Sequence, residues 1–100
     1  MKTYFTVYQN EVRVVELIIH DQNDAIFEPS AAFAQVINDA DVTVLAETTA
    51  TVSSNSISMT LNTTVTATPG TYEIIWRIVK TVSSVISTYY HKTQVVVEKL

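Results

Sequence analysis

The sequence predicts an all-β fold, a two-sheet antiparallel β-sandwich, from two observations. First, β-branched and aromatic residues are abundant, and charged residues make up only 16% of the chain, against roughly 25% in an average protein. Second, turn residues separate short alternating segments roughly every 8–12 positions. With 100 residues, 47% of them hydrophobic, the chain is expected to form a single domain over residues 1–100 with its own core.

The first third of the chain contains two expected strands. Residues 4–8 alternate between polar and apolar side chains, and residues 11–20 are apolar at both parities, which is typical of a central strand between two layers. Of that second strand, Leu17 and Ile19 are expected to point inward. The polar stretch at residues 21–24 then predicts a turn.

Residues 27–38 have two interpretations. Ser30 followed by Ala-rich sequence could cap a short helix, because Ser is a good N-cap and Ala and Gln favour helix. Alternatively, Pro29 opens an edge strand with Phe33, Gln35 and Ile37 on one face. We favour the strand because the surrounding segments are β.

The middle of the chain alternates in two segments. Residues 42–52 alternate loosely and end at the polar residues 53–55, whereas residues 56–61 alternate cleanly. Residues 63–68 are expected to stay extended as far as Pro69 and Gly70, where the chain turns.

The strongest strand pattern covers residues 71–79, whose even positions are all large and apolar. These positions are expected to fill the core: Tyr72, Ile74, Trp76 and Ile78. Residues 82–87 form either a turn or the continuation of a hairpin, and residues 88–98 form the last strand. About seven strands in this arrangement predict an immunoglobulin-like sandwich.

No arrangement of residues in the sequence indicates catalysis. The chain has no cysteine, and its single Gly excludes the usual phosphate-binding loops. The histidines, His20 and His91, are interpreted as a turn residue and a partly buried rim residue. The carboxylate pairs, Asp39 with Asp41 and Asp21 with Asp24, fall in expected turns, where they are separately solvated. We therefore expect no enzyme activity, no cofactor and no metal.

The surface contains two candidate interaction features. Four tyrosines near the two ends of the chain would form one patch if the terminal strands pair: Tyr4, Tyr8, Tyr89 and Tyr90. Residues 43–68 are rich in Thr and carry Glu47 as their only charged residue, so this face is either a docking surface or ordinary solvent-facing sheet. A net charge of −4 argues against nucleic acid as a partner.

The start of the chain contains no apolar stretch typical of a signal peptide, and no apolar run approaches the roughly 18 residues of a membrane span. We therefore expect a protein made in the cytoplasm without export, with no membrane association.

Taken together, these segments resemble the small immunoglobulin-like domains of tailed-bacteriophage virion proteins. The resemblance rests on five stretches: QNEVRVVELIIHD (9–21), FEPS (27–30), AQVINDAD (34–41), PGTYEIIWRI (69–78) and YYHKTQVVV (89–97). The turn at 21–25 lacks the Gly that such domains often carry, and residues 42–61 match no part of the pattern.

The resemblance implies a structural role without catalytic residues. Such domains decorate the capsid surface or join the head to the tail at the neck, in symmetric copies that bind other virion proteins. The alternative is an adhesion module that binds a glycan or a receptor through its exposed tyrosines.

Overall fold

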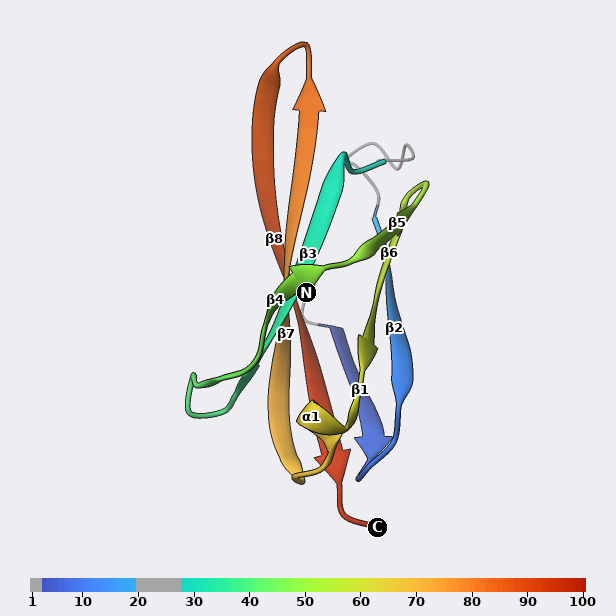
Figure 1. Ribbon diagram of the computed structural model, residues 1–100, viewed down its shortest axis with the longest axis vertical. Coiled ribbons are helices and arrows are strands. Elements are labelled where there is room, and N and C mark those ends of the chain that lie inside the picture. The colour runs from blue at the N-terminus through green and yellow to red at the C-terminus, as the bar shows by residue number, and fades with distance from the viewer. Residues whose placement is uncertain (1–2, 20–27) are drawn as a thin grey trace.

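The chain forms two β-sheets that enclose one core, in a computed structural model that describes residues 3–19 and 28–100 (Figure 1). One sheet has five strands in the order β1-β8-β7-β3-β4, and the other has three in the order β2-β6-β5. The all-β, two-sheet prediction is therefore confirmed. The elements are β1 (Thr3–Tyr8), β2 (Arg13–Ile18), β3 (Ala31–Asn38), β4 (Thr43–Thr49), β5 (Thr51–Ser53), β6 (Ser56–Leu61), α1 (Thr63–Thr66), β7 (Gly70–Val82) and β8 (Val85–Glu98).

All strand pairs of the described residues are antiparallel except one. β1 runs parallel to β8, from Thr3 opposite Thr93 to Tyr8 opposite Glu98. The expectation of a purely antiparallel sandwich is wrong at this pair. β1 and β2 lie in different sheets, so no hairpin links them and β1 is free to run parallel to its neighbour.

The core lies under the inner face of β7. Its even residues from Tyr72 to Ile78 are buried, with Ile74 and Trp76 fully inaccessible and Tyr72 and Ile78 nearly so. The Trp76 indole N–H donates to the Thr93 hydroxyl oxygen at 3.0 Å, so the one polar atom of this side chain is satisfied inside the core.

β2 forms the edge of the three-stranded sheet, so its expected central position is wrong. Val15 is its buried residue, while Leu17 and Ile19 are partly buried and pack against the core. Val14 and Ile18 point outward, which explains why this strand is apolar at both parities without lying between two layers.

Residues 31–38 of the ambiguous segment 27–38 form strand β3, so the strand interpretation is confirmed. The expected edge position is wrong, because β3 pairs with β7 on one side and with β4 on the other. Ala32, Ala34 and Val36 are buried, and small side chains there leave room for the Trp76 row on the neighbouring strand. Phe33 stands on the opposite, outer face.

Residues 63–68, expected to be extended, instead contain the one-turn helix α1. The Asn62 side chain caps it by accepting from the Thr64 N–H at 3.0 Å. Val65 and Thr66 are fully buried, and the Thr66 hydroxyl donates to the Glu11 carbonyl at 2.8 Å. The cap and these tertiary contacts override the β propensity of the Thr-rich stretch.

Trp76→Ala is expected to lower the free energy of unfolding by about 3–5 kcal/mol, because it empties a fully buried site and leaves the Thr93 hydroxyl without its donor. Urea denaturation measures the loss. The control is Val14→Ala at an exposed position, where a change below about 0.5 kcal/mol is expected. A loss below about 1 kcal/mol for the Trp76 variant contradicts the placement of this side chain in the core.

Candidate interaction surface: an apolar hairpin arm

The β7–β8 hairpin extends beyond both of its neighbouring strands. β3 pairs with β7 only as far as Val79, and β1 pairs with β8 only from Thr93 onward. Between these limits β7 and β8 pair with each other up to Val82 opposite Val85, and Figure 1 shows this end projecting past the other strands. We refer to residues 81–90, which directly follow Lys80, as the arm.

The arm exposes large apolar side chains on both of its faces. Val82 and Val85 lie opposite each other at 58% and 64% exposure. Ile86 and Tyr90 share the other face at 68% and 67% exposure. Residues 81–91 contain no Asp, Glu, Lys or Arg. An uncharged surface that exposes this much apolar area is typical of a protein-binding site.

The tip of the arm is a two-residue turn. Ser83 and Ser84 connect the strands with φ angles of 49° and 67°. Two positive φ values in a two-residue hairpin loop define a turn that Asn-Gly forms with least strain. Of the two interpretations of residues 82–87, the structure therefore supports the continued hairpin.

The backbone of β8 in the arm presents hydrogen-bonding groups at its open edge. The Ser30 N–H donates to the Val79 carbonyl at 2.8 Å, and the Thr81 N–H donates to the Ser30 hydroxyl at 3.0 Å. Because Val79 and Thr81 direct these groups away from β8, their opposite residues Thr88 and Ile86 direct theirs away from β7.

The four candidate tyrosines do not form one patch. The terminal strands pair, but the parallel register places Tyr8 opposite Glu98, eight residues along β8 from Tyr90. At about 3.3 Å per residue this separation is roughly 26 Å. Tyr89 and Tyr90, as neighbours in one strand, point to opposite faces. Tyr4 lies opposite Gln94 by its backbone, and its side chain falls outside the described part of the structure.

A polar cluster lies beside the arm on the outer face of the five-stranded sheet. Arg77, opposite Tyr90, stacks over the Phe33 ring at 4.2 Å and donates to both carboxylate oxygens of Glu47, at 2.7 and 3.2 Å. The hydrogen bonds from Arg77 lower the pKa of the Glu47 carboxyl below its usual value. Glu47 is thus engaged within the sheet, and the arm begins where this charged cluster ends.

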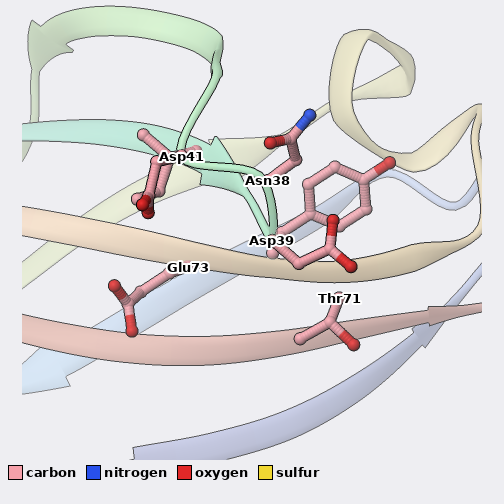
Figure 2. A pocket seen from close by; sticks show the side chains of 7 residues that line it. Asn38, Asp39, Asp41, Thr71 and Glu73 are labelled. Carbon is pink, nitrogen blue, oxygen red and sulfur yellow. The ribbon is translucent and has the colours of Figure 1, made fainter.

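An open hollow of about 200 Å³ lies at the β3–β4 turn (Figure 2). The Asn38 side chain accepts from the N–H groups of Ala40 and Val42 at 2.9 and 3.0 Å, so it shapes the turn. In Figure 2 the carboxylates of Asp39 and Asp41 point in different directions. Among the described residues, no group of three or more His, Asp or Glu side chains is placed to hold a metal ion.

The structure describes only one of the two histidines and only one of the two carboxylate pairs named from the sequence. His20, Asp21 and Asp24 lie outside the described residues, so the structure does not place them. His91 is half-buried opposite Trp76, and burial lowers the pKa of its imidazole.

No helix within residues 3–19 and 28–100 is long and apolar enough to cross a membrane. Comparison with models of known protein families finds no match to this chain, and a search among curated proteins finds no relative.

Replacing Ser83 and Ser84 by Asn and Gly is expected to stabilise the protein by roughly 1 kcal/mol, because Asn-Gly adopts both positive φ values with less strain. Thermal unfolding measures the gain. The matched control replaces both serines by Ala, which removes the hydroxyls but keeps a Cβ at each strained position. An equal gain in the Ala control contradicts the strain argument.

His91 is expected to make stability depend on pH below about 6.5, its unfolded pKa. Because its folded pKa is lower, the unfolded chain binds the proton more readily, and the free energy of unfolding falls as pH drops from about 6.5 through the folded pKa. Urea midpoints measured between pH 7.5 and pH 5 in the native protein and in His91→Gln test this. A slope unchanged by the substitution contradicts the assignment to His91.

Proposed function

We propose that this chain is a non-enzymatic structural protein that binds other proteins through its hairpin arm. The observation that carries the proposal is the arm itself, which exposes Val82, Val85, Ile86 and Tyr90 on an uncharged hairpin beyond the sandwich. An isolated two-stranded hairpin is at best marginally stable in water, so an arm with two apolar faces gains stability when a partner covers it.

We further propose that the sandwich is of the immunoglobulin type. Its three-stranded sheet, β2-β6-β5, corresponds to strands B, E and D, and β4-β3-β7-β8 corresponds to C′, C, F and G of a variable-type domain. The Tyr72 hydroxyl donates to the Thr68 carbonyl at 2.6 Å, as in a tyrosine corner. In this scheme the arm is the F–G loop, one of the loops that variable domains use for binding. The buried Trp departs from the scheme, because it lies on F and not on C.

The biological setting that we propose is the virion of a tailed bacteriophage. The resemblance in residues 9–21 and 69–78 supports a decoration protein of the capsid surface or a joining protein of the head–tail neck. Its partners would be major capsid or neck proteins, and it would join the particle in the host cytoplasm. A capsid or neck presents symmetric rings of identical sites, which suits a small domain with a projecting strand pair.

Exposed tyrosines favour a second candidate, a module that binds glycans or a receptor. Tyr90 is 67% exposed beside the Arg77 cluster. A surface that stacks sugars binds them better when several aromatic rings lie on the same face. Tyr89 and Tyr90, however, lie on opposite faces of β8. Retention on a glycan array that Tyr90→Ala abolishes would support this candidate over the structural one.

The native protein is expected to co-sediment with assembled particles in a fixed ratio to the major capsid or neck protein. Val82→Thr/Val85→Thr, which keeps side-chain shape and adds hydroxyls, should reduce the bound amount about tenfold, because two apolar contacts become unpaired polar groups. The matched control is Val12→Thr/Val14→Thr, at similar exposure directly before and within β2 of the other sheet. Quantitative mass spectrometry of purified particles gives the ratio, and absence of the native protein from them contradicts the virion assignment.

A further inference from the structure

We propose that the arm pairs edge to edge with the arm of a second copy of this chain, through the open edge of β8 and about a two-fold axis at Thr88. The inference rests on the protein-binding function proposed above, and it names the partner. It depends on the backbone direction of three alternate residues, Ile86, Thr88 and Tyr90, and on the chemistry of their side chains.

The open edge of β8 is a strand template. Ile86 and Thr88 direct their N–H and C=O groups away from β7, and Tyr90, two residues further on, does the same. On that side β1 begins its pairing only at Thr93, and no other strand of the described residues pairs with β8 there. An added strand can therefore satisfy these backbone groups.

A two-fold axis at Thr88 gives the register in which the edge best complements itself. Thr88 then faces Thr88 of the second copy, and Ile86 faces Tyr90 of the second copy on each side of the axis. In an antiparallel ladder each of these pairs exchanges two backbone hydrogen bonds. The side-chain pairs are also favourable ones, since Thr–Thr and aromatic–β-branched pairs stabilise adjacent strands.

The neighbouring registers pair less well. Shifting the axis by one residue toward β1, to Tyr89, sets Ile86 against the ammonium group of Lys92. A shift toward the tip, to Ser87, sets Tyr90 against the turn residue Ser84. The register at Thr88 places that turn beside Lys92, directly before the position where β1 begins at Thr93. As far as the structure describes the chain, the second arm therefore fits the length of this edge that no strand covers.

Charge also favours a second copy as the occupant. Residues 81–91 carry no formal charge, so two arms meet without like-charge repulsion although each chain carries a net charge of −4. Antiparallel arms set the two sandwiches at opposite ends of the paired stretch, which runs from Ser84 to Lys92, eight residues further on, and is roughly 26 Å long at about 3.3 Å per residue. The two charged bodies are therefore separated by more than the Debye length of about 8 Å at physiological salt.

The edges of β2, β4 and β5 carry features that oppose such pairing. β2 carries Arg13 and Glu16, and Arg13 forms an ion pair with Glu11 at 2.8 Å. The ladder that joins β4 to β3 has register shifts, and β5 has only three residues. Charges, bulges and short strands are the devices that block edge-to-edge association, and the arm has none of them.

Analytical ultracentrifugation of the purified chain tests the inference. We expect a concentration-dependent monomer–dimer equilibrium, and Thr88→Pro should weaken it roughly tenfold or more by removing the N–H bonds at the axis. The Thr88 N–H points away from β7, so this change removes no hydrogen bond from the hairpin itself. Thr88→Val, which keeps the N–H, should still dimerise. A native protein that stays monomeric at every concentration overturns the inference.

A single cysteine tests the register, because the chain has none of its own. Only a residue on the two-fold axis meets its own copy, at a Cα separation of about 5.5 Å that a disulfide can span. Thr88→Cys should therefore form a disulfide-linked dimer under mild oxidation on a non-reducing gel. Thr64→Cys, at a position on α1 that is also exposed, is the control. Equal cross-linking of the two variants overturns the register.

The inference and the proposed function fail in different experiments. A monomeric protein whose binding to particles depends on Val82 and Val85 keeps the proposed function and overturns the self-pairing. A dimer that Thr88→Pro disrupts, but that does not join particles, supports the self-pairing and overturns the virion assignment.

Discussion

The structure depends on one constraint, the unbroken pairing of β7 with β8. Their register runs without a shift from Gly70 opposite Val97 to Val82 opposite Val85. At one end the pair covers the core with Trp76, hydrogen-bonded to Thr93 of the partner strand. At the other end the same two strands form the arm. The arm is therefore a direct extension of the ladder that covers the core. Its side chains continue the same alternation between the two faces of the sheet as the buried residues of β7 and β8.

The sequence predicts those parts of the fold that follow from local pattern. Strand period and burial agree along β7, because a row of large apolar side chains fits only one face of a strand. The errors occur where tertiary context decides. α1 forms because Asn62 caps it and Thr66 bonds across to Glu11, a contact 55 residues away. β2 looks central by its composition, yet its position in the sheet depends on strand order, which no local pattern encodes.

The proposed interaction surface also combines features that a local sequence pattern indicates with features that only the tertiary structure decides. Tyrosine content singles out Tyr90, and the structure shows that this side chain is 67% exposed; its part in binding is a proposal, made because aromatic side chains are enriched at interfaces. Sequence reasoning missed Val82, Val85 and Ile86, since apolar residues flanking a turn look like ordinary strand ends. Their exposure arises from the lengths of the neighbouring strands. β3 pairs with β7 only as far as Val79, and β1 pairs with β8 only from Thr93 onward. A signal was nevertheless present, because residues 81–91 form an uncharged stretch that directly follows Lys80.

An uncharged, unpaired strand edge promotes aggregation unless it pairs in an assembly of fixed size. Pairing about a two-fold axis gives such an assembly, because both chains use the same edge and neither edge is left unpaired in the dimer. A head-to-tail contact would leave one edge open and extend into a filament. The protected edges of β2 and β5 add to this closure, since they offer no further template. In the proposed dimer the arm edge of β8 is therefore fully paired. The apolar side chains at the tip of each arm, around Val82, remain exposed and can contact a different partner.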